Sequence, residues 1–462
     1  MLCRIGCNDK DNLVFASDLR GRAQLSPCTF SSMLLSPYCI QFDHPESPDQ
    51  VVLFSSRTGA TVTLSRDVLR DIERNVLASD EQASLVDLGF LVTNTDAEKR
   101  EMLAYIDQMN AQSTSLRPIV VLNLDCNLAC TYCFEGTRKG KHFLSRETAD
   151  DLVGFIDQQL IGKNEIIPTF YGGEPLLSTD MIAYISEQLR ELSDARGAAY
   201  EFRMITNGTL LTRRAAERLK SLGLRSVNVT LDGPREIHDS FRPFRSGTGS
   251  FDTIVRNLHD VCGLIDVHVG GNYLQGNYQE FPRMLDHLTE SGLGPDRISS
   301  VEFSPVFQES REFVPDFHGG CATTNEPWIA QAGAFLRQEI LSRGFRNSDI
   351  EPTVCMVERF DRYVVNWDGD LYKCPNFLGR KEFCIGTLRS GRRAYNESHD
   401  LGNWKNDRCL GCCYLPLCFG GCRYFRHLRQ GTMQGVDCRK EYFDMALRPL
   451  VMQDVLREQA AG

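Results

Sequence analysis

Three closely spaced cysteines constrain this 462-residue chain more than any other feature. Cys126, Cys130 and Cys133 follow the spacing C-x3-C-x2-C, which brings three thiolates together. A cubane iron–sulfur cluster has four irons that cysteine usually holds, so three cysteines leave one iron open to a ligand that is not protein. Zinc is the alternative, but a zinc site normally closes with a fourth Cys or His, and the nearest histidine, His142, lies in a different register. The spacing therefore favours a [4Fe–4S] cluster with an open iron.

The composition is that of a globular protein with more than one domain. Hydrophobic residues make up 42% of the chain and charged residues 24%, and the length exceeds that of one ordinary core. The net charge of −10 argues against a general binder of nucleic acid or anionic membrane, which would need a basic face. No apolar run reaches about 18 residues and no secretion signal follows Met1, so we expect the protein in the cytoplasm. In that compartment, 18 cysteines indicate metal ligands rather than disulfides.

The middle of the chain has the pattern of a parallel α/β barrel. From about residue 117, short β-branched runs alternate with amphipathic helical stretches, and Ser145 and Thr212 are predicted helix N-caps. Six strands are expected, beginning near Ile119, Ile166, Phe202, Val227, Val267 and Ile298. In such barrels, the loops after the strands build the active site.

Four motifs follow the first four predicted strands. They are the cysteine loop, Gly-Gly-Glu-Pro at 172–175, Thr-Asn-Gly at 206–208 and Thr-Leu-Asp-Gly-Pro at 230–234. Each of the last three is an ordinary turn sequence alone, but their order at successive strand ends indicates one ligand site. Paired glycines let backbone approach a ligand, and Glu174 could accept from a ligand ammonium. Arg242 could pair a carboxylate bidentately, with a solvated surface arginine as the alternative.

These motifs resemble those of the radical S-adenosylmethionine (SAM) enzymes. The resemblance implies that SAM chelates the open iron and that the cluster reduces SAM to methionine and a 5′-deoxyadenosyl radical, which takes hydrogen from a peptide carbon. It places Tyr132 near the adenine and assigns no catalytic residue. The implied cofactor-binding residues are Tyr132, Gly172, Gly173, Glu174, Asn207, Thr230 and Arg242.

A second group of cysteines begins where the βα pattern ends, which puts a domain boundary between about 305 and 350. Their spacing, including Gly369 between Cys355 and Cys374, resembles the seven-cysteine SPASM domains of peptide-modifying radical SAM enzymes. The resemblance implies one auxiliary [4Fe–4S] cluster on Cys355, Cys374 and Cys422 and another on Cys409, Cys412, Cys418 and Cys438. A zinc ribbon is the alternative for the group from 409 to 422.

The first of these sets has no obvious fourth ligand. Cys321, Cys384 and Cys413 are candidates, but none has a clear spacing relative to the set. An open iron there could bind a substrate thiolate and hold it near the carbon radical, which predicts thioether formation. Sulfatase-maturing members carry an Asp directly after the cysteine that matches Cys374, where this chain has Pro375, so formylglycine formation is disfavoured.

The first hundred residues predict a small strand-and-helix domain. Strands are expected at 39–42, 51–54 and 90–92, with helices at 65–78 and 80–88. The pattern resembles the winged-helix leader-recognition domains of peptide maturases, which add an extended peptide to an exposed strand edge, here near residues 51–54. A cap that only packs on the barrel is the alternative. No cysteine spacing assigns a role to Cys3, Cys7, Cys28 and Cys39.

The sequence thus predicts an α/β protein of three parts. These are a winged-helix-like leader-binding domain at 1–110, a partial (βα)6 TIM-like radical SAM barrel at 116–310 and a SPASM domain at 320–450. The implied activity is that of an oxidoreductase with three [4Fe–4S] clusters and SAM, which forms thioethers in a precursor peptide and receives electrons from a donor such as a flavodoxin or ferredoxin. C–C or C–O crosslinking and epimerisation are alternatives, and an iron–sulfur redox sensor or electron carrier is an alternative from another class.

Overall fold

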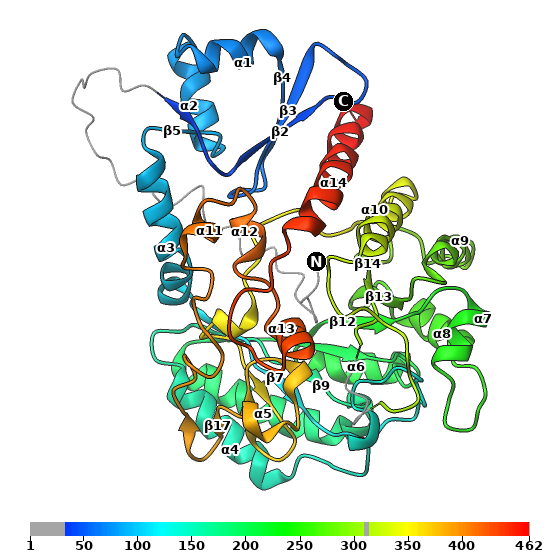
Figure 1. Cartoon of the computed structure of the whole chain (residues 1–462). Helices are drawn as coiled ribbons and strands as arrows, with labels where there is room; N and C mark the ends of the chain where they lie inside the picture. The colour runs from blue at the N-terminus through cyan, green and yellow to red at the C-terminus, as the bar shows by residue number, and fades with distance from the viewer. Residues whose placement is uncertain (1–32, 309–313, 462) are drawn as a thin grey trace.

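The computed structural model describes residues 33–308 and 314–461. Figure 1 shows a small N-terminal sheet with helices at the top, a barrel at the bottom, and a C-terminal region that extends from β17 (Gly386–Thr387) at the bottom to α14 (Lys440–Ala461) near the N-terminal sheet. The helix α3 (Thr95–Gln112) runs down one side from the N-terminal sheet to the barrel. The barrel is the part that carries the first cysteine loop.

Six parallel strands form the barrel, in the order in which they occur in the chain. They are β7 (Ile119–Val121), β9 (Thr169–Tyr171), β11 (Phe202–Thr206), β12 (Leu224–Thr230), β13 (Asp266–Tyr273) and β14 (Ser300–Pro305). The predicted parallel arrangement is confirmed, but the start of the second strand was wrong. Ile166 belongs to β8 (Glu165–Ile166), which pairs with β6 (Ser115–Leu116) and β10 (Ala199–Tyr200) in a separate sheet. Pro168 separates β8 from β9, because proline has no N–H to donate to a ladder.

Helices cover the outside of these strands. Ser145 accepts a hydrogen bond from the Thr148 N–H and Thr212 accepts one from the Ala215 N–H, so both predicted N-caps are confirmed. The helices of this part are α4 (Arg146–Gln159), α5 (Thr179–Arg196), α6 (Arg213–Ser221), α7 (Arg235–Phe241), α8 (Phe251–Val261), α9 (Phe281–Glu290) and α10 (Pro327–Ser342). Their apolar faces and the strands share one buried core, which fixes the positions of the strand ends.

The C-terminal region continues the barrel sheet, which the sequence did not indicate. Its strand β15 (Val364–Val365) pairs in parallel with β7, and β16 (Asp370–Tyr372), β17 (Gly386–Thr387) and β18 (Gly391–Arg392) follow in antiparallel order. The remaining helices are α11 (Asp407–Leu410), α12 (Leu415–Cys418), α13 (Arg423–Gln430) and α14 (Lys440–Ala461). The segment that carries the later cysteines is therefore hydrogen-bonded to β7, the strand that precedes the first cysteine loop.

The N-terminal elements were largely predicted, but their pairing was not. The antiparallel sheet has the order β2 (Cys39–Asp43), β3 (Gln50–Ser55) and β4 (Thr61–Ser65), and β1 (Leu34–Leu35) pairs with β5 (Leu91–Val92). The helices are α1 (Arg66–Glu73) and α2 (Ser79–Asp87).

The prediction that residues 51–54 form an exposed edge is wrong, because they lie in the central strand, β3. Their four consecutive apolar side chains are all buried, as expected for a strand that is covered. Of the four unassigned cysteines, Cys39 begins β2, and Cys3, Cys7 and Cys28 lie outside the described residues. Within the described ranges, no helix has both the length and the apolar character needed to cross a bilayer.

Candidate active site

The Gly-Gly-Glu-Pro motif packs directly against the cysteine loop. The Gly173 N–H donates to the Asn123 carbonyl at 3.0 Å, and the Glu174 N–H donates to the Asp125 carbonyl at 2.8 Å. A Cβ added to Gly172 would lie 2.3 Å from the Asn123 oxygen, and Gly172 has φ +140°. The paired glycines are thus required for close approach, although the backbone that they approach is the cysteine loop itself.

Glu174 joins the ends of two barrel strands. Its fully buried carboxylate accepts hydrogen bonds from Thr206 Oγ1 at 2.7 Å and from the Asn207 N–H at 2.8 Å, and also from the Leu176 N–H at 3.0 Å. Burial raises the pKa of Glu174, and these hydrogen bonds oppose the increase. In this structure the carboxylate braces the loops after β9 and β11, a role that the sequence did not predict.

The charges of all three thiols of the cysteine loop act on one ammonium group, that of Lys139. Burial alone would lower the pKa of Lys139, but the charges of Cys133, Cys126 and Cys130 raise it above its ordinary value. The Lys139 Nζ also donates to a loop carbonyl at 3.2 Å. Asn207, a predicted site residue, places its Nδ2 3.6 Å from the Cys126 sulfur. Lys139 thus supplies a positive charge that acts on each of the three predicted ligands.

Tyr132 is held by a buried polar network at the ends of β12 and β13. Its hydroxyl donates to Asp232 and accepts from Arg242 Nη1 at 2.8 Å and from Asn272 Nδ2 at 3.2 Å. The Asp232 carboxylate also accepts from the Asn272 N–H at 2.8 Å. Asp232 lies in a motif noted in the sequence but had no predicted role, and no sequence signal marked Asn272. Thr230, the predicted residue at the end of β12, is half-buried beside β13.

Arg242 is 9% exposed, so the surface alternative for this residue is wrong. Burial would lower the pKa of Arg242, but Cys130, Tyr132 and Asp232 hold it above its ordinary value. Its Nε is buried and has no hydrogen-bond partner among the described residues. A donor left in this state beside the cysteine loop suits a carboxylate ligand.

Glu135 is a further buried carboxyl group that the sequence analysis missed. Burial raises the pKa of Glu135 to about 7, and Lys139 and Arg138 oppose that increase. Within the described part of the chain, neither oxygen of its carboxyl group has a hydrogen-bond partner. Glu135 follows Cys133 by two residues, so this carboxyl group belongs to the same loop.

The donor set fits an iron–sulfur cluster that binds SAM. Three thiols, two nearby cations, Lys139 and Arg242, and the open Arg242 Nε match the needs of an anionic cluster and a carboxylate. Among residues 33–308 and 314–461, no three His, Cys, Asp or Glu side chains converge as ligands of a single metal ion.

The four cysteines of the second predicted auxiliary set lie in one neighbourhood. Burial raises the pKa of the Cys409 thiol, and the charges of Cys438 and Cys412 raise it further. The Cys418 thiol, whose pKa burial raises to about 11, lies beside Arg439, which opposes the increase. Arg439 directly follows Cys438, so the segments of Cys418 and Cys438 are neighbours.

In the other predicted set, Cys374 and Cys422 are buried in one apolar cluster and the partly buried Cys355 packs against it. A buried ion pair between Glu358 and Arg423 joins the segments of Cys355 and Cys422. The rings of Phe377 and Tyr424, with centroids 5.8 Å apart, join the segments of Cys374 and Cys422.

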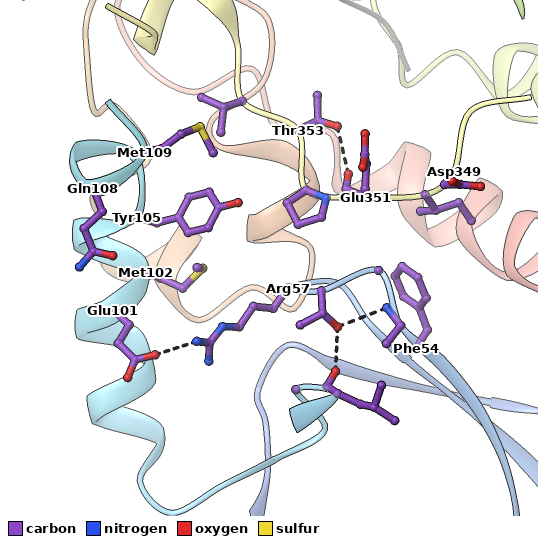
Figure 2. A pocket seen from close by; sticks show the side chains of 18 of the residues that line it. Phe54, Arg57, Glu101, Met102, Tyr105, Gln108, Met109, Asp349, Glu351 and Thr353 are labelled. Atoms are coloured by element: carbon purple, nitrogen blue, oxygen red, sulfur yellow. Dashed lines mark hydrogen bonds and ion pairs between the residues drawn. The ribbon is translucent and has the colours of Figure 1, made fainter. Parts of the chain in front are cut away.

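A separate cavity of about 1160 Å³ contains none of the predicted site residues. It lies among α3, the N-terminal sheet and residues 349–354, and Figure 2 shows Tyr105, Arg57 and Glu351 around it. Its floor includes Ile119 and Thr169, which begin β7 and β9, so it lies at the opposite end of the strands from the cysteine loop. We place the candidate active site at the loop because the chemistry-bearing groups converge there.

Comparison with known proteins agrees with this site. Residues 120–288 match the radical SAM superfamily, and the matched segment includes the three cysteines and the motifs after the first four strands. The chain therefore carries a radical SAM domain.

Two curated relatives extend the comparison. The chain is 33% identical over 183 residues to the Fe-coproporphyrin III synthase of Methanosarcina barkeri, a match that covers 38% of this chain and 42% of that protein. It is 24% identical over 335 residues to the serine-type anaerobic sulfatase-maturating enzyme of Bacteroides thetaiotaomicron, which covers 64% of this chain and 80% of that enzyme. The chain thus spans less than half of the first relative but most of the second.

Two solved structures have the same fold. The anSMEcpe enzyme with bound AdoMet and Kp18Cys peptide is 18% identical with a TM-score of 0.60, and the match covers 75% of this chain and 99% of that one. Streptococcus suis SuiB bound to S-adenosylmethionine is 14% identical with a TM-score of 0.52, and the match covers 87% of this chain and 98% of that one. This chain therefore has the radical SAM α/β fold.

Proposed function

We propose that this protein modifies a ribosomally made precursor peptide by forming thioether bonds between cysteine sulfurs and carbons of the same peptide. The observation that carries the proposal is the convergence of the three-cysteine loop, Glu174 and the Tyr132–Asp232–Arg242 network at one end of the barrel. When bound there, the cluster and SAM supply a radical that can remove hydrogen from an unactivated carbon.

The protein groups at this site hold and shield the cofactor. Cys126, Cys130 and Cys133 would ligate the cluster, and Arg242 would pair with the SAM carboxylate through donors that include its open Nε. Tyr132, fixed by its hydroxyl, lies between the rings of Phe241 and Phe317 at centroid distances of 6.2 and 6.1 Å. These rings supply an apolar wall for a purine base.

A peptide substrate is supported by the relatives that match most of this chain. One is named for maturing sulfatases, and one neighbouring structure contains a peptide together with AdoMet. Residues 1–110 would then act as a winged-helix-like leader reader, 116–310 as the radical SAM core and 320–450 as a SPASM domain. We place the reaction in the cytoplasm, with a flavodoxin or ferredoxin as electron donor.

The leader would bind at an open strand edge of the N-terminal sheet, and β4 is the better edge. The Ser55 N–H donates to the Ala60 carbonyl at 2.9 Å, and hydrogen-bonded pairs alternate along an antiparallel ladder, so the N–H groups of Thr61 and Thr63 point away from β3. Thr61 of β4 also lines the separate cavity, so a peptide strand added to β4 would lie beside that cavity.

Thioether formation removes two hydrogens from the peptide. One leaves a carbon as a hydrogen atom taken by the radical from SAM; the other leaves the cysteine sulfur as a proton, with one electron passed to an auxiliary cluster. Pro375, in place of the acidic residue of sulfatase-maturing enzymes, disfavours the formylglycine product.

Mass spectrometry of a precursor peptide encoded beside this gene tests the proposal. We expect a loss of two hydrogens per bond, with modified cysteines that resist iodoacetamide after reduction, which separates a thioether from a disulfide. Cysteine-to-serine variants of the peptide should lose the change. A two-hydrogen loss that persists in a cysteine-free peptide would support C–C or C–O crosslinking instead, and an isobaric product would support epimerisation.

A redox sensor or electron carrier accounts for less of the structure. It would need a cluster but would have no use for the Arg242 Nε or for the buried network around Tyr132. Formation of 5′-deoxyadenosine by the reconstituted protein decides between this alternative and an enzyme.

A further inference from the structure

The structure separates the three cysteines that could complete the Cys355, Cys374 and Cys422 set. Cys384 is only partly buried against the apolar cluster of Cys374 and Cys422, and its thiol donates to the Gly386 carbonyl at 3.1 Å. Cys413 neighbours Cys412, a member of the other auxiliary set. Cys321 is fully buried in the same apolar cluster as Cys374 and Cys422.

The backbone holds Cys321 in a fixed position beside β14. The Cys321 N–H donates to the Val306 carbonyl at 2.9 Å, and the Gln308 N–H donates to the Cys321 carbonyl at 2.9 Å. The turn before it requires glycine, because Gly320 has φ +94° and a Cβ there would lie 2.8 Å from the Gln308 nitrogen.

The residues that hydrogen-bond to the Cys321 backbone belong to the segment 306–308, and this segment also contacts the residues that follow Cys422. The Phe307 ring packs edge-on against Phe425 with centroids 4.9 Å apart. The Tyr424 hydroxyl donates to the Gln308 carbonyl at 3.2 Å. The two thiols are close enough for the charge of Cys422 to act on Cys321.

Contacts around α13 thus bring four cysteine segments to one place. Tyr424 contacts the segment of Cys374 through Phe377 and the segment of Cys321 through Gln308, while Arg423 pairs with Glu358 near Cys355. A buried cysteine is often only a small apolar side chain. That reading does not account for a position near Cys422, in the apolar cluster that also contains Cys374.

We propose that Cys321 is the fourth ligand of the auxiliary cluster held by Cys355, Cys374 and Cys422. The assignment rests on the proposed function to the extent that this function includes auxiliary clusters. It deepens the function because a closed cluster has no iron free for a substrate thiolate. The cluster then serves the reaction as an electron acceptor and not as a ligand of the substrate sulfur.

Substitution of each candidate cysteine in the full-length, anaerobically reconstituted protein tests the assignment. Because the cluster of the Cys126 loop has an open iron of its own, these substitutions are made in a variant in which Cys126, Cys130 and Cys133 are replaced by Ala. In that background Cys321→Ala should leave one auxiliary cluster with a labile iron, detected as a [3Fe–4S] electron paramagnetic resonance signal after mild oxidation. Cys384→Ala and Cys413→Ala are matched controls and should give the spectrum of the background variant. A [3Fe–4S] signal produced by either control but not by Cys321→Ala would overturn the assignment.

A second measurement leaves Cys321 intact, so it does not depend on how that variant folds. Replacing Cys126, Cys130 and Cys133 with Ala removes the cluster expected to have an open iron. In this background, added 2-mercaptoethanol should not change the spectrum of the reduced protein, because both auxiliary clusters are closed. A shifted spectrum would overturn the assignment. If this variant holds no iron, auxiliary clusters are rejected, while the radical SAM site is still tested separately by SAM cleavage in the parent.

Discussion

The cysteine loop and the N-terminal sheet differ in how many of their backbone N–H and C=O groups are hydrogen-bonded within the described residues. The loop makes backbone hydrogen bonds with residues 140–142, 173–174 and 241–245, so three separate segments fix it. The N-terminal sheet pairs β3 on both sides, while β2 and β4 each pair on one side only in the described residues. The first arrangement suits a site that must be rigid, and the second suits one that receives another chain.

Of the changes that we predict, removing the three thiols of the cysteine loop should have the largest effect. With Cys126, Cys130 and Cys133 replaced together by Ala, we expect the loss of one of three [4Fe–4S] clusters and of all SAM cleavage, because no protein ligand remains to present the open iron. Iron analysis and chromatography of 5′-deoxyadenosine measure both. Stoichiometric zinc in the parent, or undiminished cleavage by the variant, would contradict the assignment.

Glu174→Ala tests whether hydrogen bonds to the buried Glu174 carboxylate stabilise the loops after β9 and β11. The change leaves Thr206 Oγ1 and two backbone N–H groups without their acceptor, each costing roughly 1–3 kcal/mol if it stays unsatisfied. Thermal and denaturant unfolding should show the lower stability. The exposed Glu187→Ala on α5 is the control and should change stability by less than about 0.5 kcal/mol. Equal effects of the two substitutions would show that Glu174 is not a brace.

Asp232→Asn tests the network that fixes Tyr132. The substitution removes the charge 3.9 Å from Arg242 and weakens the hydrogen bond from the Tyr132 hydroxyl. We expect SAM to bind about tenfold more weakly, equivalent to about 1.4 kcal/mol, with an unchanged iron content. Equilibrium binding measures this, with the exposed Asp260→Asn as control. Unchanged SAM affinity would remove Asp232 from the site.

The smallest effect on SAM chemistry should come from the strand edge. Thr63→Pro removes an N–H that points away from β3, so it should abolish leader binding while SAM cleavage without peptide is unaffected. Thr63→Ala keeps the N–H, and Gln41→Pro makes the equivalent change on the β2 edge. If Gln41→Pro, and not Thr63→Pro, abolishes binding of the precursor peptide, the leader uses the other edge.

Point substitutions serve this test better than removal of residues 1–110. The Tyr105 ring of α3 stacks on Phe419 at 5.2 Å, and Met102 and Ile106 bury against Trp404. A deletion that includes α3 would open this apolar cluster, so lost activity could reflect lost packing.

What the sequence predicted well depends on local spacing. The cysteine loop and the helix caps at Ser145 and Thr212 are set by residues a few positions apart. The strand order followed because consecutive βα units place their strands side by side.

What the sequence missed depends on contacts between distant segments. Asn272 reaches Tyr132 across 140 residues, and β15 joins β7 across the whole barrel domain. The prediction for residues 51–54 was wrong for the same reason, since a local sequence pattern identifies a strand but not the strands beside it. Cys321 could be named as a candidate but not selected until its contacts near Cys422 were known.

The fate of hydrogen removed from the peptide tests the central claim most directly. A precursor peptide deuterated at its carbon-bound positions would be incubated with SAM, a one-electron reductant and the reconstituted protein. We expect deuterium in 5′-deoxyadenosine and, in the same reaction, a peptide that has lost one carbon-bound deuterium and one sulfur-bound hydrogen. Unlabelled 5′-deoxyadenosine formed beside a modified peptide, or an unmodified peptide despite SAM cleavage, would contradict direct radical modification of this substrate.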